Sequence, residues 1–231
     1  MKNHNNNETQ KYGNDEIYES PIDTYIFHPI GLSLVDPIYK LGLTPNQITI
    51  ISTFFTFISC YLIRENKLKL AVIFYLSGYI LDCVDGRLAR KYGMGSKIGA
   101  ALDMVSDVIT NTVLLISILY YKKNFIKLNS VFILIICFIG LTICHGFTEA
   151  VNNYKKNGSD NFYKNIEKEY SCSNNLIYKL YIMFNKSSYS TYKCIIGDYD
   201  SIKIHNYIGI LKYFGPGTFN IVYAIIILTL K

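Results

Sequence analysis

The sequence contains no tryptophan and only five prolines in 231 residues. Its six cysteines show no CxxC or other metal-ligand spacing, so neither a zinc site nor a disulfide framework is predicted. Nothing in the chain resembles a nucleic-acid recognition motif, and nucleic acid is therefore not an expected partner. The N-terminus is rich in Asn and acidic residues and has no apolar core of a cleavable signal, so the first spanning helix is expected to direct insertion.

Long hydrophobic runs are the feature the chain does have. Half of the residues are hydrophobic, the mean hydropathy is +0.19, and the apolar residues gather in blocks such as Ile48–Ile63, Val131–Thr148 and Tyr213–Leu230. About 20 helical residues cross a bilayer core about 30 Å thick. A helix of a soluble protein would interrupt such runs with a polar face. The sequence therefore predicts an all-α integral membrane protein, and its 21 tyrosines are expected to anchor it at the interface.

The order of the segments predicts a bundle of five to six transmembrane helices. Residues 1–20 read as a disordered polar tail, and residues 21–41, which are interrupted by Pro29 and Pro37, read as an interfacial amphipathic segment. Thr44 and Pro45 are a helix start, with Thr44 as the N-cap. Five spans are expected, at about 46–63, 69–86, 98–121, 130–148 and 208–230, the last interrupted at Gly215-Pro216-Gly217.

The distribution of Lys and Arg predicts the orientation. Most of them lie in residues 1–45, 87–97 and 150–207, which share one side of the membrane if the spans are as listed above. Because cytoplasmic connections carry an excess of Lys and Arg, this side is expected to be the cytoplasmic one. Residues 150–207 are then a polar cytoplasmic insertion, with a short amphipathic patch at Leu176–Phe184. We expect a multi-pass protein of the endoplasmic reticulum or a similar internal membrane, with its site on the cytoplasmic side.

Four aspartates interrupt the second and third spans. Asp82 and Asp85 are three residues apart and share a helical face, as do Asp103 and Asp107, which are four apart. A carboxylate at the bilayer centre costs at least about 2.5 kcal/mol, so each needs a partner or a metal. A short loop joins the two helices, which we expect to pack antiparallel with these faces opposed. Four converging carboxylates would suit Mg²⁺ or Mn²⁺.

Any one of these aspartates is as readily explained as a helix-end acid paired with Arg87 or Arg90. The four together, at matched spacing, favour the metal site. Gly86 and Gly99 each lie close to a carboxylate and would let a bulky ligand approach the backbone. Gly99 shares the face of Asp103 and Asp107, whereas Ala101 lies on the opposite face, where a Leu should be tolerated if that face meets lipid.

The spacing also carries a resemblance. The residues from Asp82 to Arg90, followed by Gly99, Asp103 and Asp107, match D-x2-D-G-x2-A-R-x8-G-x3-D-x3-D at all eight fixed positions. This signature is similar to that of the class-I CDP-alcohol phosphatidyltransferase family. Residues 42–49 also resemble the start of the first span in that family, and the resemblance covers residues 21 to about 150.

The resemblance implies a site with two metal ions, Mg²⁺ or Mn²⁺. Asp82, Asp85 and Asp103 look like metal ligands, and Asp107 looks like a ligand shared with the second ion that also serves as the catalytic general base. The nucleotide-binding segment implied by the family comprises Asp82, Gly86, Ala89, Arg90 and Gly99. The membrane domain would extend over residues 21–231.

The resemblance further implies phosphatidyl transfer from CDP-diacylglycerol to a small alcohol acceptor, with release of CMP, in phospholipid biosynthesis. One alternative is a choline- or ethanolamine-type phosphotransferase, with a CDP-alcohol donor and a diacylglycerol acceptor. Another is a membrane scaffold that retains the motif without activity. Val108 stands where some inositol-using members have Arg, although Leu102-Asp103-Met104 resembles inositol-type sequences. A homodimer is a candidate assembly, and membrane lipids are expected partners.

Other polar residues near these spans carry less weight. His145 and Glu149 are four residues apart at the end of the fourth span, where a capped helix end is the favoured explanation. Lys91 and Lys97 are expected to be solvated loop cations, with attraction of an anionic acceptor as the alternative.

Overall fold

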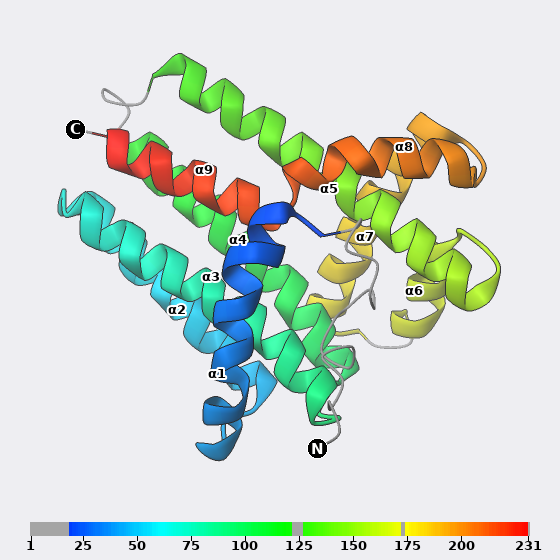
Figure 1. Cartoon of the computed structure of the whole chain (residues 1–231), viewed down its shortest axis with the longest axis horizontal. Coiled ribbons are helices and arrows are strands. Elements are labelled where there is room, and N and C mark those ends of the chain that lie inside the picture. Colours follow the sequence, from blue (N-terminus) through cyan, green and yellow to red (C-terminus); the bar gives the residue numbers. More distant parts are fainter. Residues whose placement is uncertain (1–18, 122–126, 172–173, 231) are drawn as a thin grey trace.

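The computed structural model describes residues 19–121, 127–171 and 174–230, and every regular element within them is a helix. The N-terminal segment comprises a π-helical turn, η3 (Asp23–Phe27), and α1 (His28–Lys40). In Figure 1 this segment lies across α3. Of the expected tail of residues 1–20, all but Glu19 and Ser20 lie outside the described residues.

Three helices follow, and their order confirms the sequence prediction. α2 (Pro45–Arg64) begins with a capping box, in which the Gln47 amide donates to Thr44 Oγ1 and the Thr44 amide donates to Gln47 Oε1. α3 (Leu68–Lys91) and α4 (Lys97–Tyr121) complete this part of the bundle. Both pack against α2.

The second half of the chain is more helical than its composition predicts. α5 (Leu128–Asn157) has 30 residues and is therefore about 45 Å long, more than a bilayer core requires. α6 (Phe162–Tyr170), α7 (Leu176–Ile196) and α8 (Ser201–Leu211) pack around its C-terminal end. A 3₁₀ turn, η4 (Lys212–Phe214), then leads into α9 (Pro216–Thr229), so the interruption expected at Gly215 is confirmed.

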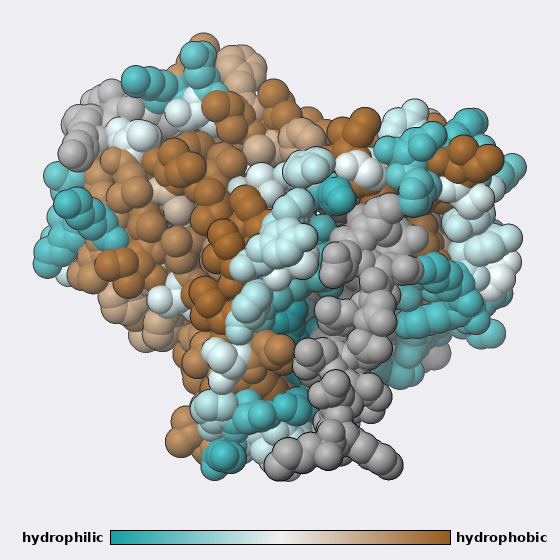
Figure 2. Space-filling model, in the orientation of Figure 1, coloured by the Kyte–Doolittle hydropathy of each residue, from teal (hydrophilic) through white to brown (hydrophobic). Residues whose placement is uncertain are grey.

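Four segments among the described residues are long and apolar enough to cross a membrane. They are Pro45–Arg64, Lys97–Tyr121, Leu128–Asn157 and Ser201–Thr229. The expected span at 69–86 is present as α3, but α3 is not among these four. Figure 2 shows hydrophobic residues gathered on the side of α2, α3 and α9, whereas the side of α6 is hydrophilic. The chain is thus an all-α integral membrane protein.

The hydrophobic interior forms three clusters. The largest joins α2, α3, α4, α5 and α9 and includes Ile63, Tyr75, Leu114 and Ile227. A smaller one, which includes Val35 and Leu88, joins α1, α2 and α3. The third joins the C-terminal part of α5 to α6, α7 and α8, and we call this region the lobe (residues 144–211). The lobe therefore has a core of its own.

The lobe includes residues 150–207, for which a polar insertion was expected, and these residues are largely helical. The short amphipathic patch expected at Leu176–Phe184 is the beginning of a 21-residue helix, α7, which packs against α4, α5 and α6. The backbones of α5 and α7 come close at Gly146, where a Cβ would lie 2.6 Å from the carbonyl oxygen of Ser188.

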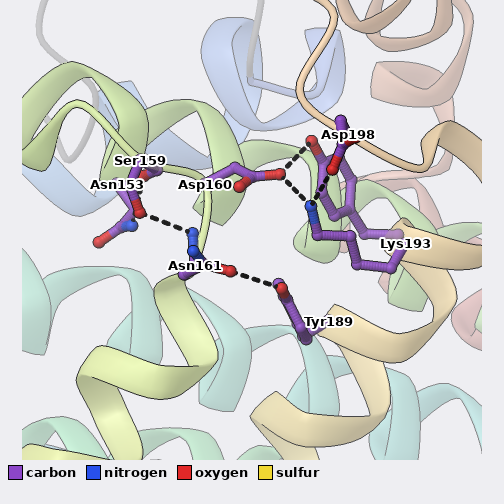
Figure 3. Close-up of polar contacts among 8 residues, drawn as sticks. Asn153, Ser159, Asp160, Asn161, Tyr189, Lys193 and Asp198 are labelled. Carbon is purple, nitrogen blue, oxygen red and sulfur yellow. Dashed lines mark hydrogen bonds and ion pairs between the residues drawn. The ribbon is translucent and has the colours of Figure 1, made fainter.

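A polar network fixes the turn between α5 and α6 to α7 (Figure 3). Lys193 Nζ lies 2.5 Å from Asp160 Oδ2, and Tyr189 Oη donates to Asn161 Oδ1 at 2.7 Å. In the same turn, Asn153 Nδ2 donates to the carbonyl of Ser159 at 2.6 Å. Opposite charges and matched donors and acceptors therefore satisfy the polar side chains of this turn.

Candidate active site

Three of the four predicted carboxylates meet between α3 and α4. Asp82, Asp85 and Asp103 each offer an oxygen, and these atoms lie within 4.8 Å of one another. The aspartate-bearing faces of α3 and α4 are opposed as expected, although the backbones of the two helices stay apart and both helices pack closely on α2. The carboxylates instead reach across the space between the two helices.

Asp107 lies outside this group of three and is exposed on α4. Among the other carboxylates, Asp107 nevertheless acts most strongly on Asp82, whereas Asp103 acts most strongly on Asp85. This pairing follows from antiparallel helices: the residues nearer the connecting loop face each other, as do the residues one turn further away. All four carboxylates therefore belong to one electrostatic neighbourhood.

A residue that sequence reasoning missed holds Asp85 in place. Thr49 on α2 donates its hydroxyl hydrogen bond to Asp85 Oδ2, and both side chains are buried. The two residues are 36 positions apart, and no spacing rule connects them. The only available signal was that Thr49 belongs to the segment 42–49 that resembles the family. Thr49 orients this carboxylate as a second-layer partner orients a metal ligand.

The donor set of this group fits a hard divalent cation. Asp82, Asp85 and Asp103 contribute only carboxylate oxygens, the ligands that Mg²⁺ and Mn²⁺ prefer. Three like charges this close repel one another, and a cation between them would remove that repulsion. Asp82 and Asp103 are half-buried and Asp85 is buried.

The predicted nucleotide segment lies on the C-terminal part of α3. A Cβ at Gly86 would lie 3.2 Å from Nη1 of Arg90, so the glycine leaves room for the guanidinium to lie along the helix. Arg90 is exposed and interacts with Asp85 and Asp103. Ala89 is half-buried, and its carbonyl accepts from the Met94 amide at 2.9 Å, where the chain leaves α3.

Gly99 lies against α2. A Cβ at this position would lie 2.7 Å from Oδ1 of Asn46 and 2.8 Å from Oγ of Ser96. The glycine thus allows the first turn of α4 to approach Asn46, a second polar residue that sequence reasoning did not single out. Ala101 has no exposed surface, so the condition that its face meets lipid does not hold.

The alternative explanation, that the aspartates are paired with neighbouring arginines, applies to one arginine only. Arg87 is buried and donates from Nη1 to the carbonyl of His28 at 2.8 Å. It therefore fastens α1 to α3, whereas Arg90 interacts with the carboxylates.

The remaining candidates have structural partners. Lys91 Nζ lies 2.5 Å from Asp36 Oδ1, and Lys97 Nζ lies 3.1 Å from Glu169 Oε1. These pairs join the two ends of the α3–α4 connection to α1 and to α6. His145 and Glu149 are half-buried on α5.

Comparison with known proteins relates this geometry to a family. The model of the CDP-alcohol phosphatidyltransferase family matches residues 42–166, more than half of the chain. The archaetidylinositol phosphate synthase of Pyrococcus horikoshii is 40% identical over 79 residues, which cover 34% of this chain and 42% of that protein. The phosphatidylinositol phosphate synthase of Corynebacterium glutamicum is 36% identical over 83 residues, covering 34% of this chain and 38% of that protein.

A third relative is named for a different acceptor, serine. The CDP-diacylglycerol–serine O-phosphatidyltransferase of Helicobacter pylori is 35% identical over 91 residues, which cover 38% of each chain. The chain thus spans about two fifths of the length of these curated relatives. No solved structure matches it significantly. With the family model covering α2 to the first turns of α6 and the carboxylates brought together between α3 and α4, this chain belongs to the CDP-alcohol phosphatidyltransferase family.

Proposed function

We propose that this protein transfers a phosphatidyl group from CDP-diacylglycerol to a small alcohol and releases CMP, and that two divalent cations, Mg²⁺ or Mn²⁺, take part. The observation that carries the proposal is the convergence of Asp82, Asp85 and Asp103 in a member of this family. Such a cluster of like charges suits cation binding better than structural stability.

Asp107 is the proposed general base. Its side chain is exposed and therefore accessible to an acceptor hydroxyl, and its charge acts on Asp82 of the carboxylate group. It takes the hydroxyl proton while the acceptor oxygen forms a bond to the lipid phosphorus and the bond from that phosphorus to the CMP oxygen breaks. Bound cations would neutralise the pyrophosphate and make CMP a better leaving group.

Arg90 and Gly86 are proposed to hold the diphosphate of the donor. A guanidinium presents two parallel donors that match phosphate oxygens. Because residue 86 is a glycine, the Arg90 guanidinium can lie close to the helix backbone, where a phosphate would meet it. Asp82, Ala89 and Gly99 complete the proposed nucleotide segment.

The acceptor is tested directly with a panel. Purified protein is given labelled CDP-diacylglycerol with serine, inositol or inositol phosphate, and in a separate arm labelled CDP-choline or CDP-ethanolamine with diacylglycerol. A labelled phospholipid in the first arm supports the proposal. Product in the second arm only would assign the reversed roles of donor and acceptor. The absence of CMP release in every arm would favour a scaffold without activity.

Orientation is a separate proposal, with the carboxylates on the cytoplasmic side. The pairs Lys91–Asp36 and Lys97–Glu169 support a shared side for the segments that they join, and the excess of Lys and Arg in these segments favours the cytoplasmic side. Asn157, in the sequon Asn157-Gly158-Ser159, is exposed at the end of α5. In a glycosylating membrane system this sequon is expected to stay unmodified. A glycosidase-sensitive gel shift that is absent in Asn157→Gln would show that this side faces the lumen and would contradict the proposed orientation.

A further inference from the structure

A second group of ligand atoms lies on the other side of α3. Asp23 of η3, His28 of α1 and Cys83 of α3 each offer one atom, and the three atoms lie within 4.8 Å of one another. A carboxylate, an imidazole and a thiol form a mixed donor set that favours Zn²⁺, unlike the all-oxygen set of the candidate active site.

Asp23 is fixed by two hydrogen bonds. Its side chain is only 3% exposed, Tyr79 Oη donates to Oδ1 at 2.6 Å, and the amide of Gly217 donates to Oδ2 at 2.8 Å. A Cβ at Gly217 would collide with this carboxylate, so the glycine at the start of α9 is required for the contact. Carboxylates that bind metals are commonly oriented by such outer hydrogen bonds.

His28 has the corresponding partner. Its Nδ1 lies 2.9 Å from Glu19 Oε2, and neither side chain is more than 22% exposed. A carboxylate on one ring nitrogen fixes the imidazole and raises the basicity of the other nitrogen, an arrangement that recurs at zinc sites. Two of the three candidate ligands therefore already have the outer partners that a metal site needs.

Cys83 faces away from the catalytic carboxylates. A Cβ at Gly31 of α1 would lie 3.6 Å from the Cβ of Cys83, which places the thiol toward α1. Asp82 and Asp85, the neighbours of Cys83 in sequence, face α4 instead. The same two turns of α3 thus present oxygen ligands to one side and a sulfur ligand to the other.

We propose that Asp23, His28 and Cys83 form a Zn²⁺ site that fastens the N-terminal segment to α3. Three protein ligands leave one tetrahedral position for water. The proposal goes beyond the proposed function and does not depend on it, since metal bound here contacts none of the catalytic carboxylates. The absence of any CxxC spacing is no objection, because the ligands come from three elements and meet only in the folded chain.

The test measures metal binding and needs no turnover. Full-length protein in detergent is titrated with Zn²⁺ against a chromogenic chelator, and with Co²⁺, whose bond to a thiolate produces an absorption band in the near ultraviolet. Cys83→Ser and His28→Gln remove one ligand each. The matched controls are Cys144→Ser, which alters a buried cysteine on α5, and Asp103→Asn, which alters the candidate active site.

With excess Mg²⁺ present to occupy the carboxylates between α3 and α4, the proposal predicts one high-affinity Zn²⁺ site. Its affinity should fall at least about 100-fold in Cys83→Ser and in His28→Gln, more than the loss of an outer partner causes. Cys144→Ser and Asp103→Asn should bind as the wild type does. The Co²⁺ band should appear in the wild type and be absent from Cys83→Ser.

Three results would overturn the assignment. They are wild-type Zn²⁺ affinity in Cys83→Ser, the absence of a thiolate band in the Co²⁺-loaded wild type, and loss of Zn²⁺ binding in Asp103→Asn alone. If Cys83→Ser is not recovered as folded protein, His28→Gln and the wild-type Co²⁺ spectrum decide the question.

Discussion

Two buried aspartates, one between α3 and α4 and one in the lobe, have opposite surroundings. Asp85, 4% exposed, lies with Asp82 and Asp103, whereas Asp160 in the lobe, 8% exposed, lies 2.5 Å from Lys193 Nζ. An ion pair with matched hydrogen bonds serves the fold, since each charge compensates the other. Like charges held together have no such benefit. The comparison teaches that the charge of the groups around a buried carboxylate, more than its burial, distinguishes a candidate site from a structural network.

The largest difference between the two regions is expected in catalysis. Asp107→Asn should lower turnover by at least about 10²-fold, as the loss of a general base does, while the affinity for CDP-diacylglycerol remains nearly unchanged. Turnover is followed by CMP release and affinity by equilibrium binding. The control is Asp160→Asn, whose activity per folded molecule should match the wild type. Equal turnover in Asp107→Asn and Asp160→Asn would contradict a catalytic role for Asp107.

The second effect concerns Thr49, which holds Asp85. Thr49→Val should raise the Mg²⁺ or Mn²⁺ concentration needed for half-maximal activity by about 10- to 100-fold, as the loss of an outer partner of a metal ligand does. Thr49→Ser should restore the wild-type value. Thr53→Val is the matched control, because the Thr53 hydroxyl donates to the carbonyl of Thr49 and not to a carboxylate. An unchanged cation requirement in Thr49→Val would remove Thr49 from the site.

A third effect should appear in stability alone. Gly146→Ala places a Cβ 2.6 Å from the backbone oxygen of Ser188 and should reduce the free energy of unfolding by about 1–3 kcal/mol. At Gly209 on α8 a Cβ would meet no atom within 4 Å, so Gly209→Ala should instead stabilise by about 0.4–1 kcal/mol. Thermal unfolding in detergent measures both. CMP release per folded molecule that falls in Gly146→Ala would show that the lobe also serves the site.

The smallest effect is expected for the exposed ion pair between Asp36 and Lys91, at the C-terminal end of α3. Hydrogen bonds from Lys91 and Tyr92 lower the pKa of Asp36, and Asp36 in turn raises the pKa of Tyr92 to about 12. A lowered carboxyl pKa gives stability above the ordinary carboxyl pKa that is lost as pH falls through the lowered value. Asp36→Asn should therefore cost about 0.2–1 kcal/mol at neutral pH and less in acid. A cost in thermal unfolding that is equal at pH 7 and pH 3 would contradict this.

The sequence predicted features that depend only on neighbouring residues in the chain. Thr44 and Pro45 start α2, Gly215 separates α8 from α9, and the spacing of Asp82 and Asp85 places both on one face of α3. Each of these statements needs only the geometry of one helix. The roles of Asp107 and of the nucleotide segment remain predictions from the resemblance to the family.

The misses were contacts between distant segments. The tolerance expected at Ala101 required that its face meet lipid, yet Ala101 is buried on α4, the helix against which α7 packs. α7 itself was read as a short patch because residues on its buried side, such as Asn185 and Ser188, are polar. The spacing of hydrophobic residues does not reveal a helix whose buried face is polar. It also does not show which distant helix packs against a given face.

The most direct test of the central claim is metal-dependent CMP release from CDP-diacylglycerol by the purified protein, with wild type and Asp103→Asn assayed in parallel. The wild type should release CMP with Mg²⁺ or Mn²⁺ and stop when excess chelator is added. Asp103→Asn should bind metal more weakly and release CMP at least about 10²-fold more slowly. Wild-type activity that persists in excess chelator, or an unimpaired Asp103→Asn, would contradict the assignment of the carboxylates between α3 and α4 as the active site.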